Sequence, residues 1–117
     1  MNAPKINTAI PERRYHIGAF TAVILGDVES SDGRTYHYIL ALVPDGEHEP
    51  SLYVTSEQAE AGRGSEGDTI VRVIAGDGER ALGPDARWRD LDAFSEDALA
   101  MMQRVMRLTD EEPVRLL

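Results

Sequence analysis

The chain contains no cysteine, and this absence excludes several kinds of chemistry at once. Disulfide bonds, Cys-ligated zinc and thiol catalysis all require that residue. No apolar stretch approaches the roughly 20 residues that a membrane-spanning helix needs. The N-terminal residues 1–11 also lack the basic region and apolar core of a secretion signal. We therefore expect a cytoplasmic protein that makes no use of a membrane.

Positive charge is scarce: the chain has 12 Lys and Arg residues against 21 Asp and Glu residues, which gives a formal net charge of −9. Affinity for nucleic acids comes largely from basic side chains that neutralise phosphates, so no nucleic-acid partner is expected. The acidic excess is concentrated between Asp45 and Glu79. A solvated surface is the simplest interpretation of this segment. The alternatives are a docking face for a basic partner and a mimic of nucleic acid.

The length of 117 residues is typical of one domain. Residues 1–12 carry Pro4 and Pro11 among polar residues without periodicity, so we expect a flexible N-terminal arm over 1–12 and a single domain over 13–117. No internal repeat or low-complexity tract suggests a further boundary.

Three Asp-Gly pairs follow runs of β-branched and aromatic residues, and they end at Gly33, Gly46 and Gly78. Asp-Gly is a strong hairpin signal because a type I′ turn needs positive φ at both central residues. The pattern predicts an antiparallel meander of four or five strands. If Asp32 and Gly33 form the first loop by themselves, Leu25 lies opposite Leu40.

The middle of the chain gives mixed signals. Residues 52–55 predict a short strand, and the Thr-Ser-Glu-Gln sequence at 55–58 fits the capping box of a short helix ending near Gly62. The glycine-rich segment 62–67 predicts a loop, and 68–76 predicts a strand. A last strand is expected over 86–91, around Trp88.

The C-terminal region predicts one amphipathic helix. Ser95 is the expected N-cap, and the residues after it place apolar side chains on one half of the helical wheel and arginines on the other. The expected fold class is therefore α+β: a curved antiparallel β-meander of four or five strands with this helix packed on one face.

Candidate catalytic chemistry is sparse. The three histidines show no local metal-ligand spacing, and no Ser-His-Asp pattern is visible, so we expect no catalytic residue, no metal and no cofactor. Aromatic and titratable residues do gather on the first strands, where they are candidates for a ligand pocket between sheet and helix. These residues are His16, Asp27, Tyr36, His37 and Tyr38.

Both faces of the first hairpin are apolar, but one helix covers only one face of a sheet. A curl of the sheet, the loop from Gly76 to Phe94 that carries Trp88, or another subunit could cover the second face, and the last of these favours self-association or a protein partner. The favoured function is a non-catalytic interaction module acting as a homodimer or with a protein partner. The alternative is a domain that binds a small molecule or a metal in a pocket between sheet and helix, with or without enzymatic activity. Candidate anchors of an interface are Phe20, Trp88, Phe94, Met101, Met102 and Met106.

Overall fold

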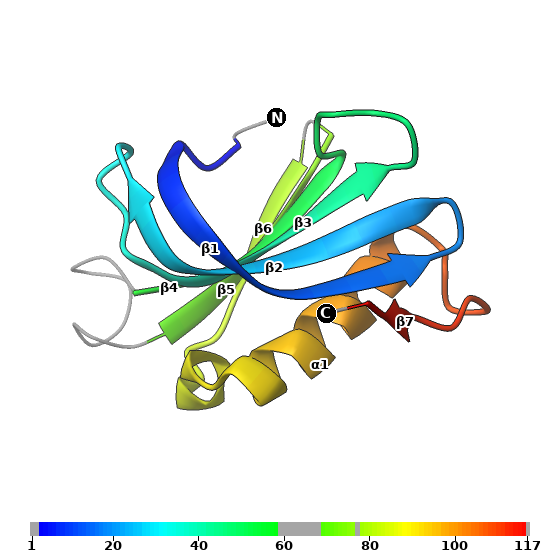
Figure 1. Cartoon of the computed structure of the whole chain (residues 1–117). Coiled ribbons are helices and arrows are strands. Elements are labelled where there is room, and N and C mark those ends of the chain that lie inside the picture. Colours follow the sequence, from blue (N-terminus) through cyan, green and yellow to red (C-terminus); the bar gives the residue numbers. More distant parts are fainter. Residues whose placement is uncertain (1–2, 59–68, 77, 117) are drawn as a thin grey trace.

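A computed structural model describes residues 3–58, 69–76 and 78–116, and it shows one antiparallel sheet with a helix on one side (Figure 1). The elements in chain order are β1 (Ile6–Ile17), β2 (Phe20–Ser30), β3 (Tyr36–Pro44), β4 (Leu52–Gln58), β5 (Thr69–Ala75), β6 (Gly78–Leu82), the 3₁₀ helix η1 (Ala86–Arg89), α1 (Leu91–Val105) and β7 (Val114–Arg115).

The sheet has seven strands in the order β6-β5-β4-β3-β2-β1-β7. The first six strands form the predicted meander, and β7 pairs with β1 at Tyr15 and His16. The α+β class is confirmed, but the expected four or five strands understate the sheet. The expected arm over 1–12 also differs from the structure, because residues from Ile6 onward belong to β1. The pairing of β1 with β2 shifts register at three places, all between Ile6 and Arg13. These shifts interrupt the alternation of apolar and polar residues by which a strand is predicted from sequence.

The register of the β2–β3 hairpin differs by one residue from the expectation. Leu25 lies opposite Ile39, and Ile24 lies opposite Leu40. The reason is that residues 31–35 together connect the two strands. Within this loop the Asp32 side chain accepts a hydrogen bond from the Arg34 backbone N–H at 3.0 Å. This side-chain contact stabilises the longer loop in place of the expected two-residue turn.

The short helix expected after Thr55 is not formed over 55–58, because these residues continue β4 and pair with β5. Tertiary contacts override the local capping pattern here: Thr55, the expected N-cap, donates a hydrogen bond to the Glu57 carboxylate at 2.9 Å, and Ser56 donates to the carbonyl of Trp88 at 2.6 Å. The rest of that helix and the glycine-rich segment 62–67 lie outside the described residues. The strand expected over 68–76 is confirmed as β5.

The helix α1 begins earlier than expected. Asp90 is its N-cap and accepts a hydrogen bond from the Ala93 backbone N–H at 2.9 Å, whereas Ser95 lies within the helix. The residues of the expected strand over 86–91 instead form η1, the N-cap Asp90 and the first residue of α1, and Asp85 caps η1 by accepting a hydrogen bond from the Arg87 backbone N–H. Within the described residues, no helix is long and apolar enough to cross a membrane.

The hydrophobic core lies between the sheet and α1. Alternate residues of the strands point toward the helix, and Ile24, Leu40 and Val54 are fully buried there. From the helix, Phe94 and Met102 fill the space with no exposed surface. Apolar packing therefore closes the centre of this side of the sheet.

Replacing Phe94 by Ala is expected to lower the free energy of unfolding by about 3–5 kcal/mol, since a fully buried ring leaves a cavity. The matched control is Val105→Ala on the same helix, where the side chain is 49% exposed and the expected change is within about 0.5 kcal/mol. Urea denaturation of both variants measures the difference. Equal losses for the two variants would contradict the assignment of the core.

Candidate functional site

The face of the sheet opposite the helix is concave. β1 and β2 bend strongly (Figure 1), and the bend coincides with the irregular pairing of β1 and with Asp27, whose φ is +46°. Ile39 and Ile74 on this face are almost fully buried. The curl of the chain therefore covers most of the second apolar face.

An open cavity of about 640 Å³ lies at one end of the concave face. Its walls come from segments far apart in the sequence: the residues before β1, the β2–β3 loop, and the strands β3, β5 and β6. The lining residues are Ala3, Pro4, Lys5, Asp32, Arg34, Tyr36, Arg72, Ile74 and Glu79.

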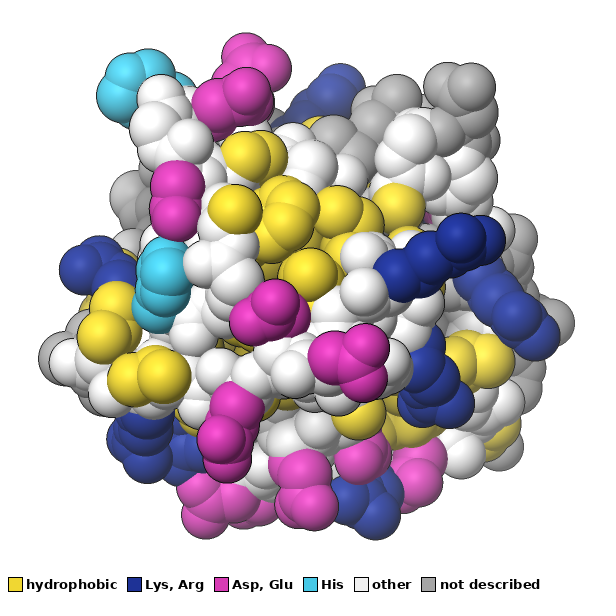
Figure 2. All heavy atoms as spheres, turned by 90° about the vertical axis from the view of Figure 1, so that its right-hand side faces the viewer, with side chains coloured by type: hydrophobic (Ala, Val, Ile, Leu, Met, Phe, Trp, Pro, Cys, Tyr) yellow, Lys and Arg dark blue, Asp and Glu magenta, His cyan; other side chains and the backbone are white. Residues whose placement is uncertain are grey.

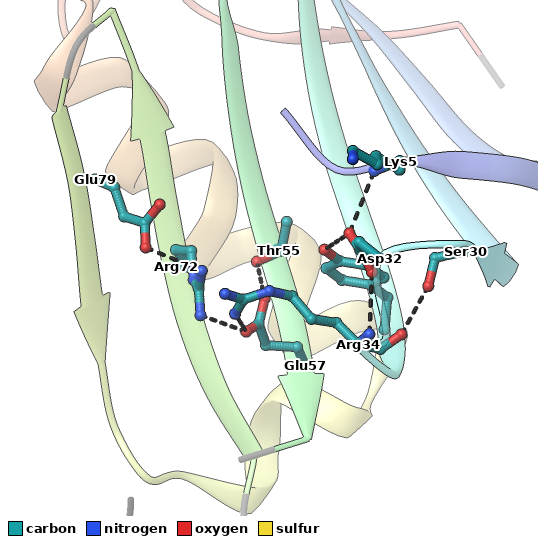
Figure 3. Close-up of polar contacts among 9 residues, drawn as sticks. Lys5, Ser30, Asp32, Arg34, Thr55, Glu57, Arg72 and Glu79 are labelled. Carbon is teal, nitrogen blue, oxygen red and sulfur yellow. Dashed lines mark hydrogen bonds and ion pairs between the residues drawn. The ribbon is translucent and has the colours of Figure 1, made fainter. Parts of the chain in front are cut away.

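Four charged side chains form a continuous chain of ion pairs beside this cavity (Figure 3). Glu79 of β6 accepts a hydrogen bond from Arg72 of β5 at 2.9 Å, and Arg72 in turn donates to Glu57 of β4 at 2.8 Å. Arg34 of the β2–β3 loop donates to the same Glu57 oxygen, also at 2.8 Å. The chain of charges therefore crosses the sheet from the edge strand β6 to the β2–β3 loop.

Glu57 and Arg72 are the most deeply buried members of this cluster, with 1% and 3% of their surface exposed. Burial raises the pKa of Glu57, although hydrogen bonds from Thr55 and Arg34 act in the opposite direction. The Nε of Arg72 is buried and has no hydrogen-bond acceptor among the described residues. An unmatched buried donor is uncommon, and it occurs here at the wall of an open cavity.

Asp32 is the second polar centre. It accepts hydrogen bonds from the Tyr36 hydroxyl at 2.6 Å, the Arg34 backbone N–H at 3.0 Å and the Lys5 backbone N–H at 3.2 Å. Burial opposes ionisation of Asp32, but these hydrogen bonds outweigh it and lower its pKa. Burial and the Asp32 carboxylate together raise the pKa of Tyr36, whose hydroxyl therefore stays protonated.

The opposite end of the concave face is apolar. The directly opposed residues Val23, Ala41, Tyr53 and Ile74 form one row across four strands, and Ile74 reaches the cavity. A second hollow near Val23 has lining residues that include Val43, Pro44, Asp45 and Glu47. Figure 2 shows hydrophobic side chains gathered on one face of the molecule, with acidic side chains above and below them and basic side chains to their right.

The structure does not bring the five predicted pocket residues together. Only Tyr36 lines the cavity. His16 is half-exposed and contacts Asp45 at 3.1 Å, and Asp27 is exposed. Tyr38 stacks on Phe94 of α1 with ring centroids 5.7 Å apart, so it belongs to the closed helix side.

His37 lies apart from the cavity as well. Its Nε2 is buried without a hydrogen-bond partner among the described residues. Burial, with a smaller effect of Arg89, lowers its pKa. The space between the central strands and α1, where a pocket was expected, is occupied by the core.

Sequence reasoning missed the charged residues Lys5, Arg34, Arg72 and Glu79 at the cavity and Glu57 in the ion-pair cluster beside it. One signal was present, because Arg72 is a single charge within the apolar run Thr-Ile-Val-Arg-Val-Ile-Ala of β5. A charge at the centre of a buried strand predicts a buried partner. Its partner Glu57 was instead assigned to a helix.

The predicted interface anchors lie in or against the core. Trp88, Phe94 and Met102 are buried, and the Trp88 indole N–H donates to Asp97 at 2.9 Å. Phe20, Met101 and Met106 are partly buried against the same cluster. The fully buried residues are unavailable to a partner while the protein is folded.

No group of three or more potential metal-ligating side chains is found in the described part of the chain. Comparison with protein-family models, curated proteins and solved structures finds no match to this chain.

The lowered pKa of Asp32 predicts a pH-dependent contribution to stability. The contribution is present above the pKa of Asp32 in the unfolded chain and is lost as the pH falls through the lower folded pKa. Asp32→Asn removes this titration. The stability advantage of the unmodified protein over the variant should therefore shrink between about pH 6 and about pH 2, measured by chemical denaturation.

Glu57 is present in both proteins of this comparison, so its own titration largely cancels in the difference. Tyr36→Phe is the intermediate variant, because it removes one hydrogen bond to Asp32 and leaves the carboxylate. A stability difference that is constant across the pH range would contradict the assigned role of Asp32.

Proposed function

We propose that the concave cavity binds a small molecule that carries an acidic group and an apolar body, and that the protein does not convert this molecule chemically. The observation that carries the proposal is an open cavity whose carboxylates are already hydrogen-bonded, whereas some of its cationic donors are not. Among the described residues, the space between the central strands and α1 is filled by apolar side chains, and the groove between β6 and α1, at about 380 Å³, is smaller than this cavity.

The size of the cavity supports a small ligand. Its volume of about 640 Å³ falls inside the range of about 300–1,000 Å³ that is typical of small-molecule sites. Ile74, Pro4 and Ala3 line the cavity and supply apolar contacts for the body of such a ligand.

The charges support an acidic ligand. Asp32 accepts several hydrogen bonds, and Glu79 is paired with Arg72. Among the described residues no carboxylate contacts the Lys5 ammonium group, and the Arg72 Nε lacks an acceptor. An anionic group would gain Coulomb attraction from Lys5, whereas a cation would be repelled by it.

The protonation states support binding without catalysis. The raised pKa of Tyr36 keeps its hydroxyl protonated, and the lowered pKa of Asp32 makes this carboxylate a weak base. Both groups are suited to hold a ligand in place. The cytoplasmic location expected from the sequence is part of the proposal.

A matched pair of ligands tests the proposed charge preference. Octanoate and octylamine share an apolar chain and differ in the sign of the charged group. Octanoate should raise the thermal midpoint, since a ligand at 100 times its dissociation constant adds about 2.7 kcal/mol. Octylamine should not raise it.

Variants locate the binding site. Lys5→Gln should weaken octanoate binding about tenfold, measured by calorimetry. The fold should be unaffected, because the Asp32 contact uses the Lys5 backbone N–H. Arg107→Gln is the control, since Arg107 is exposed and lines neither this cavity nor the hollow near Val23. Equal binding of both ligands, or identical affinities for the two variants, would contradict the proposal.

A further inference from the structure

The strand β6 is an open edge of the sheet. It ends the strand order, and all of its residues are exposed. Within the described part of the chain no strand pairs with its outer side. A free strand edge presents unpaired backbone N–H and C=O groups, to which another extended segment can add.

An apolar groove of about 380 Å³ adjoins this edge, between β6 and the C-terminal half of α1. Val73 and Met101 contribute to its wall. Leu82 of β6 is 36% exposed and Val105 of α1 is 49% exposed. Side chains of an added strand that point toward the helix side would enter this groove, because alternate residues of a strand share a face.

Two arginines give the groove its charge. Arg80 of β6 and Arg104 of α1 both line it, and in the described residues neither forms an ion pair with a carboxylate. Glu79, the acidic residue of β6, is directed to the other face, where it pairs with Arg72. The groove is thus a positively charged surface on a chain of net charge −9.

A second copy of the chain does not complement this edge. Antiparallel pairing of two β6 strands about a two-fold axis keeps both helices on the same side of the joined sheet. Arg80 of each copy would then lie directly opposite, or close to, its counterpart on the same face. Like charges in such positions destabilise strand pairing. The charge of the groove instead complements acidic side chains.

We propose that β6 and this groove dock an extended segment of a partner protein, in which apolar and acidic side chains alternate along one face. The partner strand adds to β6 through backbone hydrogen bonds. Its apolar side chains contact Leu82 and Val105, and its acidic side chains pair with Arg80 and Arg104. This site is separate from the ligand cavity and does not depend on it.

The test uses the peptide Glu-Thr-Leu-Thr-Glu-Thr-Val-Thr, titrated into the protein and followed by NMR. Its glutamate, leucine and valine side chains share one face of a strand. Chemical-shift changes are expected in β6 and in the C-terminal half of α1. Binding should weaken as the salt concentration rises, because exposed charges are screened.

Charge-reversal variants test the role of the two arginines, and one further variant serves as the control. Arg80→Glu and Arg104→Glu should each weaken binding about tenfold. Arg107→Glu should leave the affinity unchanged, since Arg107 is exposed and does not line the groove. The same peptide with lysine in place of glutamate should not bind. Circular dichroism checks that each variant retains the fold.

Three results would overturn the proposal: equal affinity for the acidic and lysine peptides, shift changes away from β6 and α1, or no binding. Dimerisation in sedimentation experiments that is abolished by Leu82→Glu would also overturn it, because a second copy would then occupy the edge. None of these results bears on octanoate binding in the cavity.

Discussion

The carboxylate of Glu57 is the constraint on which the concave half of the structure depends. It is buried, and it receives hydrogen bonds from Thr55, Arg34 and Arg72. Removing one partner of a buried ion pair typically costs about 3–5 kcal/mol, because the other charge is left uncompensated. The positions of the β2–β3 loop, β4 and β5 are therefore tied together at this point, and Glu79 extends the connection to β6.

The two faces of the sheet are stabilised by different physics. Toward α1, apolar side chains exclude water and fill the available space around Phe94. On the concave face, paired charges replace part of the apolar contact and leave a cavity open beside them. Apolar packing is not directional, whereas ion pairs need defined geometry. The concave face is consequently the place where the chain positions specific donors.

The strand β6 belongs to both proposed sites. Glu79 faces the cavity and pairs with Arg72, whereas Arg80, its neighbour, faces the groove beside α1. Because successive side chains of a strand point to opposite faces, one short edge strand contributes to a small-molecule site on one side and to a docking surface on the other.

The sequence by itself determined the α+β class, the meander and the amphipathic helix, since these follow from local periodicity and turn residues. Only the tertiary structure decided the register of β2 and β3, the strand conformation at Glu57 and the position of the cavity. The physical reason is that these features depend on contacts between distant residues. The partner that makes Glu57 stable in a buried strand is Arg72, and no local pattern in the sequence specifies that pairing.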